Sequence, residues 1–166
     1  MNKNLIRILV WPNITNWKNK NIKHLEQDSY IQVIRNQIKV LNDIRDDLFF
    51  YLVLPQIVPS LRFDNATPLI TTISSPKHFK DYNKKELKEI LDGNKFDLPT
   101  YAPTMRSHFD VEFIRKLLST DFDLVMSHLP EHTHNLKNTL YNTTHHTPLF
   151  FGYCHWFDIK GVVKTN

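Results

Sequence analysis

Two stretches of the chain are most informative about its fold, namely Phe122-Asp-Leu-Val-Met-Ser-His128 and Leu149-Phe-Phe-Gly-Tyr-Cys-His155. Each is a short apolar run that ends in a histidine. A polar stretch between them, residues 131–142, is compatible with a helix that starts just after Pro130. Strand, helix and strand in this order are the unit from which parallel sheets are built. Ligands bind at the carboxyl ends of the strands in such sheets, so both histidines are candidates for a binding site.

The same alternation of strand and helix patterns runs along the rest of the chain. Asp28 or Ser29 can cap a helix in which isoleucines recur at helical spacing, Asp110 can cap another, and Gly93 fits a helix stop. Trp17 falls in a polar loop, residues 12–27, and residues 61–68 read as a connector. The pattern predicts an α/β fold with a mainly parallel sheet of about five or more strands and helices on both faces. The predicted strands are 5–11, 48–54, 69–74, 122–127 and 149–153, and the predicted helices are 28–45, 84–92, 110–118 and 131–142.

Length and composition limit the classes of function that the chain can have. The chain has 166 residues, which predicts a single domain, and a net charge of +4 without a dense basic block. Only three glycines are present, so a glycine-rich phosphate loop is not expected. The single cysteine, Cys154, lies in an apolar run and is better explained as an inert thiol than as a nucleophile. No secretion signal or membrane-spanning run is visible, so we expect a cytoplasmic protein.

A zinc site is suggested by one motif and opposed by its context. Residues 128–132 match the pattern H-x-x-E-H, which needs both histidines on one helical face. Pro130 instead favours an extended residue before it and a helix that starts after His128. We therefore expect no metal, although a metal-dependent hydrolase remains a third hypothesis.

Two groups of residues are the main candidates for binding. His128 and Glu131 fall at a strand end and a helix start, where unpaired N–H groups favour an anionic or hydroxyl-rich ligand. The alternative role for Glu131 is to complement the helix dipole. His155, Trp156 and Asp158 combine an imidazole, a stacking surface and a carboxylate, which suits general-base or ligand-orienting work. The alternative is a half-buried histidine beside a core tryptophan.

Two further residues are weaker candidates. Asn13 follows the first strand, where α/β folds commonly bind ligands. Arg106 lies on a long loop before a helix, where it either contacts an acidic group or is simply exposed. Neither has the glycine pattern of a dinucleotide site around it.

Three segments in this order resemble the N-terminal half of GT-B glycosyltransferases. They are Ile6-Arg-Ile-Leu-Val-Trp-Pro12, Asp123-Leu-Val-Met-Ser-His-Leu-Pro-Glu131 and Pro148-Leu-Phe-Phe-Gly-Tyr-Cys-His-Trp-Phe-Asp158. Retaining members of that superfamily often have a histidine-bearing strand, a helix, and a strand that ends in histidine. The resemblance covers nearly the whole chain, but the first loop lacks the glycines that many relatives carry.

The resemblance implies a Rossmann-like domain that binds the sugar acceptor. His155 would correspond to the strand-end histidine near the donor sugar, and His128 to the histidine of the preceding strand. The nucleotide sugar would bind a second, C-terminal domain that this sequence lacks, so no cofactor is expected here. Residues 1–166 would then be one half of a longer enzyme and inactive alone. The acceptor class stays open between a glycan, a lipid, a protein and a modified nucleic acid.

A different class of function also fits the residues. A non-catalytic α/β module could use the same strand-end surface to bind a partner protein or a nucleic acid. The basic balance and the aromatic residues are compatible with this alternative.

Overall fold

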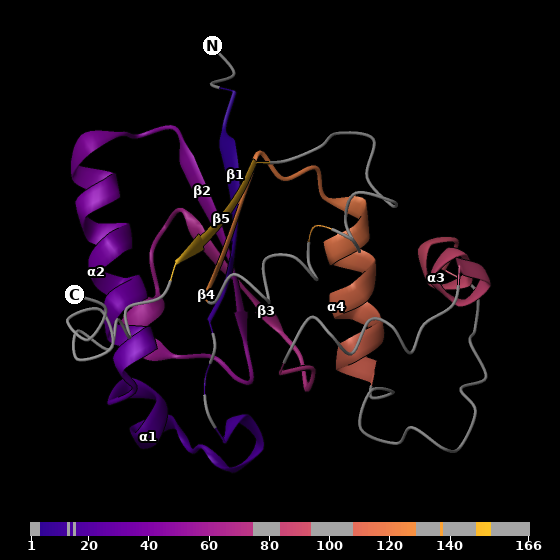
Figure 1. The fold of residues 1–166 in the computed structure, drawn as a ribbon, viewed down its shortest axis with the longest axis horizontal. Coiled ribbons are helices and arrows are strands. Elements are labelled where there is room, and N and C mark those ends of the chain that lie inside the picture. Colours follow the sequence, from indigo (N-terminus) through magenta and orange to yellow (C-terminus); the bar gives the residue numbers. More distant parts are fainter. Residues whose placement is uncertain are drawn as a thin grey trace, which may run out of the picture.

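The computed structural model describes residues 4–12, 14, 16–74, 84–93, 108–128, 137 and 149–153. Its centre is a sheet of five parallel strands in the order β3-β2-β1-β4-β5 (Figure 1). The predicted α/β fold with a Rossmann-like parallel sheet is therefore confirmed. The strands are β1 (Ile6–Trp11), β2 (Leu48–Leu54), β3 (Ala66–Ile70), β4 (Leu124–His128) and β5 (Leu149–Tyr153).

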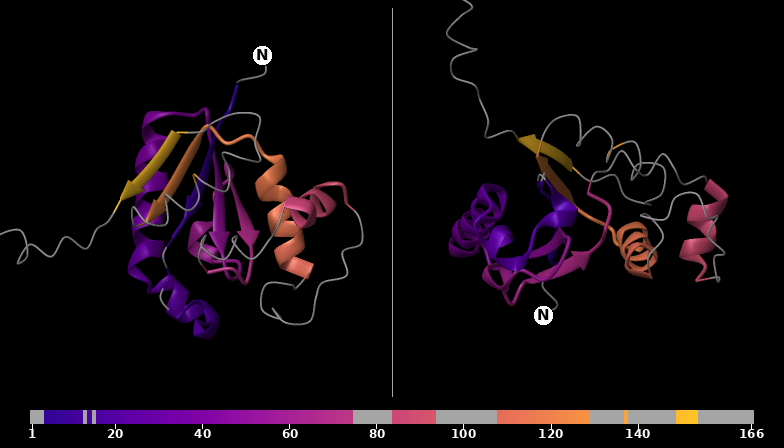
Figure 2. Two further views of the ribbon diagram at one scale, coloured as in Figure 1. Left: turned by 45° about the vertical axis from the view of Figure 1, so that its right-hand side comes forward. Right: turned by 90° about the horizontal axis from the view of Figure 1, so that it is seen from below.

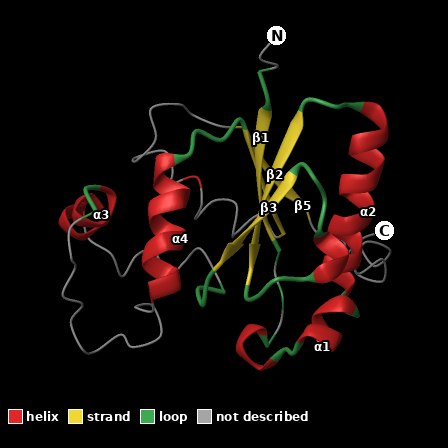
Figure 3. Cartoon of the chain, turned by 180° about the vertical axis from the view of Figure 1, so that it is seen from behind, coloured by secondary structure: helices red, strands yellow, loops and turns green. Residues whose placement is uncertain are grey.

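Helices lie on both faces of this sheet (Figure 3). α2 covers one face, and α4 covers the other, with α3 packed against the outer side of α4 (Figures 1 and 2). The helices are α1 (Ile22–Glu26), α2 (Ser29–Ile44), α3 (Lys84–Leu91) and α4 (His108–Ser119). None of the helices within the described residues is long and apolar enough to cross a bilayer.

The α2 helix forms where its sequence predicts it. Asp28 is the N-cap, and its Oδ1 accepts a hydrogen bond of 3.0 Å from the N–H of Tyr30. Ile31, Ile34 and Ile38 recur on one stripe and are buried against the sheet. Capping and burial thus act on the same sixteen residues, which explains why both ends of this helix could be predicted.

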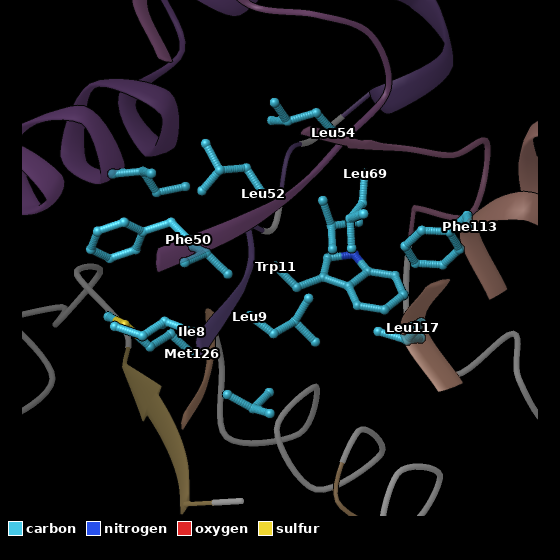
Figure 4. Close-up of a cluster of buried hydrophobic side chains, with 14 of the residues drawn as sticks. Ile8, Leu9, Trp11, Phe50, Leu52, Leu54, Leu69, Phe113, Leu117 and Met126 are labelled. Carbon is cyan, nitrogen blue, oxygen red and sulfur yellow. The ribbon is translucent and has the colours of Figure 1, made fainter. Parts of the chain in front are cut away.

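The core has two layers that meet in the sheet (Figure 4). Ile8, Phe50 and Leu52 point toward α2, whereas Trp11 points toward Phe113 of α4. The rings of Trp11 and Phe113 lie edge to face, with centroids 5.4 Å apart. Residues that alternate along β1 and β2 are therefore buried on both faces of the sheet, as their continuous apolar runs predicted, whereas Leu149 and Phe151 of β5 are exposed.

One predicted strand was placed wrongly. The third strand was expected at residues 69–74, but β3 is Ala66–Ile70. Residues 61–68 were predicted to be a connector, so the prediction left Pro68 outside the strand. β3 is an edge strand, where a proline is tolerated, and Pro68 pairs with Leu52.

The loop expected at residues 12–27 is also partly wrong. It contains a 3₁₀ turn at Trp17–Asn19 and the short helix α1. Trp17 is buried, and its Nε1 donates to the carbonyl oxygen of Thr71 at 3.2 Å. This long-range contact orders a segment that is polar in sequence.

The remaining boundaries agree to within about two residues, as is usual for element ends. β1, β2 and β5 match closely, and β4 is shifted by two residues at its start and one at its end. Gly93 has φ of 75° and follows α3, as its stop role predicts. The predicted helix at 131–142 lies outside the described residues except for Lys137, which is helical.

Candidate functional site at the carboxyl edge of the sheet

The carboxyl ends of all five strands emerge at one edge, because every pairing in the sheet is parallel. The strand order reverses direction at β1, since β2 lies on one side of it and β4 on the other. Crevices for ligands form at such a switch point in open α/β sheets. Trp11 and Ser127 are paired there, and both side chains are buried.

His128 is the predicted site residue that the structure describes, through its backbone. It is the last residue of β4 and pairs with Tyr153, the last residue of β5. The other predicted site residues lie outside the described residues, and their roles stay predictions. They are Asn13, Arg106, Glu131, His155, Trp156 and Asp158.

A buried polar cluster joins the end of β3 to the first turn of α4. The Asp110 carboxylate is 0% exposed and accepts hydrogen bonds from the hydroxyl of Thr71 at 2.7 Å and the N–H of Thr72 at 2.7 Å. The Thr72 hydroxyl donates to its second oxygen. Thr71 Oγ1 in turn accepts from the N–H of Ile73 at 3.0 Å. This cluster fixes the start of α4 against the carboxyl edge of the sheet.

The predicted role of Asp110 as a helix cap was wrong. It was expected to cap the helix from outside, but α4 begins at His108, so Asp110 lies within the first turn. Its carboxylate accepts hydrogen bonds from Thr71 and Thr72, which directly follow β3 and are 39 and 38 positions away. The available signal was the pair Thr71-Thr72 directly after an apolar run, but no local pattern links it to Asp110.

The loops that follow β1 and β2 are tied to each other at the same edge. Lys20 forms an ion pair with the N-cap residue Asp28, and Gln56 donates to the carbonyl oxygen of Lys20 at 3.1 Å. The Glu26 carboxylate accepts from the N–H of Ser60 at 3.0 Å. The ion pair is largely buried, so salt screens it less than a surface pair. These bonds hold the segments that follow β1 and β2 in one arrangement at the carboxyl edge of the sheet.

The opposite, amino edge of the sheet carries paired charges. Arg45 donates two hydrogen bonds to Asp47, at 2.8 and 2.6 Å. These bonds, and then the charge of Asp47, raise the pKa of Arg45 above its ordinary value. Both groups remain partly exposed, so this pair is an ordinary surface contact.

The described residues set limits on the chemistry of the carboxyl edge. No group of three or more histidine, cysteine, aspartate or glutamate side chains within them is arranged to hold a metal ion. Asp110 accepts three hydrogen bonds from Thr71 and Thr72, which indicates a structural role for its carboxylate. The edge therefore offers a rigid frame, with His128 at the end of β4.

Comparison of the chain with protein-family models, with curated proteins and with solved structures found no match in any of the three.

Proposed function

We propose that this chain is the acceptor-binding domain of a two-domain glycosyltransferase. The complete enzyme would move a sugar from a nucleotide-sugar donor, bound on a C-terminal domain, to an acceptor bound here. The observation that carries the proposal is the pairing of His128 with Tyr153 at the carboxyl edge of the sheet.

This pairing brings the two histidine-bearing segments close together. Neighbouring strands lie about 4.8 Å apart, and two residues of chain span at most about 7 Å. In this proposal we therefore expect His155, two residues after Tyr153 in the sequence, within about 12 Å of His128 from Cα to Cα. Side chains from both segments can then reach one bound sugar.

The proposed chemistry is transfer to a hydroxyl group. The acceptor oxygen attacks the anomeric carbon of the donor sugar. The bond from that carbon to the nucleoside diphosphate breaks, and the hydroxyl proton of the acceptor must leave. His155 would orient the reacting groups or accept that proton, because an imidazole titrates near neutral pH. His128, Glu131, Trp156 and Asp158 would line the acceptor cleft, with a stacking surface from the indole.

The rigid frame supports this arrangement. Arg106 precedes α4 by two residues, and the Asp110 cluster fixes the start of α4 at the same edge. Asn13 follows the carboxyl end of β1, beside the switch point. We propose both as additional acceptor contacts.

A non-catalytic binding module is the second candidate function. It is favoured by a different observation, namely the exposed apolar side chains of Leu149 and Phe151 on the edge strand β5. Exposed apolar surface beside an open sheet edge is typical of protein-binding sites. In that case the strand-end histidines would not be needed for any reaction.

Sugar transfer provides the test of the domain assignment. We expect the longest natural form of the protein to release nucleoside diphosphate from at least one of a panel of uridine- and guanosine-linked sugars. Cell extracts of lipids and oligosaccharides would serve as the acceptors. The 166-residue chain alone should show no release above the background, because the proposal assigns donor binding to a second domain. Transfer by the 166-residue chain itself would contradict the assignment.

A further inference from the structure

Thr71 directly follows β3 and is bonded to three other segments at the carboxyl edge of the sheet. It is buried, and its N–H donates to the carbonyl oxygen of Leu54, the last residue of β2, at 3.0 Å. Its hydroxyl donates to Asp110 in the first turn of α4 at 2.7 Å. Its carbonyl oxygen accepts from the indole Nε1 of Trp17 at 3.2 Å. One buried residue thus connects β2, α4 and the segment that contains Trp17.

The segment that contains Trp17 lies across the carboxyl ends of two strands. We define the Trp17 segment as residues 16–21, which include the 3₁₀ turn Trp17–Asn19. The Trp17 side chain is buried and reaches the end of β3. The carbonyl oxygen of Lys20 accepts from Gln56, which follows β2, at 3.1 Å. The Trp17 segment therefore covers the carboxyl ends of β2 and β3.

The hydrogen bonds around Thr71 depend on one another. While its hydroxyl donates to Asp110, the same oxygen accepts from the N–H of Ile73 at 3.0 Å. The N–H of Thr72 also donates to Asp110, at 2.7 Å. Loss of the bonds to Asp110 would release residues 71–73, and with them the carbonyl oxygen that Trp17 uses. A buried N–H without an acceptor is unfavourable, so the indole would leave its place as well.

We propose that Thr71 joins the Trp17 segment and the start of α4 into one conformational unit, which opens and closes as a whole. Proteins commonly open locally in cooperative units of this kind. A ligand at the carboxyl edge that contacts either part of the closed unit would therefore stabilise both parts. The proposal does not depend on sugar transfer, because a sugar acceptor and a partner protein would act on the same unit.

Hydrogen exchange of the 166-residue chain, followed by NMR, tests the coupling in one direction. Thr71→Val removes the hydroxyl but keeps the main-chain carbonyl that Trp17 uses. We expect the indole N–H of Trp17 to exchange at least about 10-fold faster in this variant than in wild type. Thr67→Val is the matched control and should leave this rate unchanged. It makes the same change on β3, and the Thr67 hydroxyl forms no hydrogen bond with the described residues.

The reverse direction uses Trp17→Phe, which keeps an aromatic ring but removes the indole N–H. The signal that disappears in this variant also identifies the indole of Trp17. Because coupling between two sites is reciprocal, the N–H of Thr72 should exchange at least about 10-fold faster than in wild type. The N–H of Ile34, in the buried stripe of α2, reports global unfolding in the same samples and should change less.

Two results would overturn the coupled unit. One is faster exchange of the Thr72 N–H in Thr71→Val while the Trp17 indole exchanges at the rate of the Thr67→Val control. The other is a rise at the Trp17 indole no larger than the rise at Ile34, since the whole chain would then unfold without a separate local opening. If Thr71→Val does not fold, Asp110→Asn weakens the same contact and decides by the same criteria.

Discussion

Replacing Asp110 with alanine is expected to lower the free energy of unfolding by about 3 kcal/mol. The carboxylate accepts from two hydroxyls and one N–H, and the Thr71 hydroxyl has almost no access to water. Hydrogen bonds to a charged group contribute about 1.5–3 kcal/mol each, and part of this is offset because the charge is no longer buried. Denaturant titration followed by tryptophan fluorescence would measure the loss.

Two variants make this experiment specific. Asp43→Ala removes an exposed aspartate on α2 and should change the unfolding free energy by less than about 0.5 kcal/mol. Asp110→Asn keeps the size of the side chain but leaves fewer acceptor positions, so it should lie between wild type and alanine. Equal stability of wild type and Asp110→Ala would show that the cluster does not hold α4 to β3.

The second large effect is expected at Ile38. Its side chain is 1% exposed and packs into the core between α2 and the sheet. Isoleucine to alanine in a core costs about 2–5 kcal/mol, and a fully enclosed site lies in the upper part of this range. We therefore expect Ile38→Ala to lower the free energy of unfolding by about 4 kcal/mol.

The same helix supplies the control for this substitution. Ile44 is 71% exposed at the end of α2, so Ile44→Ala should cost less than about 0.5 kcal/mol. Both variants make the same chemical change, and alanine is the better helix former in each. A difference of less than about 1 kcal/mol between them would mean that α2 does not cover the sheet in the way described.

Much of the fold could be predicted because its signals are local. β2 is a continuous apolar run closed by Pro55, and α2 combines a capping aspartate with isoleucines at helical spacing. Alternation of such elements is enough to indicate a parallel sheet. The two predictions that were wrong concern segments whose structure depends on contacts between residues far apart in the sequence. Trp17 is buried and donates a hydrogen bond to the carbonyl oxygen of Thr71, which directly follows β3. Pro68 is tolerated because β3 lies at an edge of the described sheet.

The candidate site was less predictable for the same reason. His128 was assigned to a strand end from its own sequence, and β4 does end there. The Asp110 cluster joins residues almost forty positions apart, and no pattern in the sequence around Asp110 indicates which residues it contacts. A hollow of about 490 Å³ between α2 and Met126 of β4 likewise depends on how α2 lies over the sheet, and no single segment of the sequence specifies that packing.

Sugar transfer by a His155→Ala variant is the sharpest test of the proposed glycosyltransferase. In the longest natural form of the protein, we expect this change to reduce transfer at least about 100-fold, as loss of an acid–base group commonly does. His24→Ala, an exposed histidine on α1, should leave transfer unchanged. Transfer by His155→Ala at the rate of the His24→Ala control would contradict a role of His155 in sugar transfer and favour a binding module.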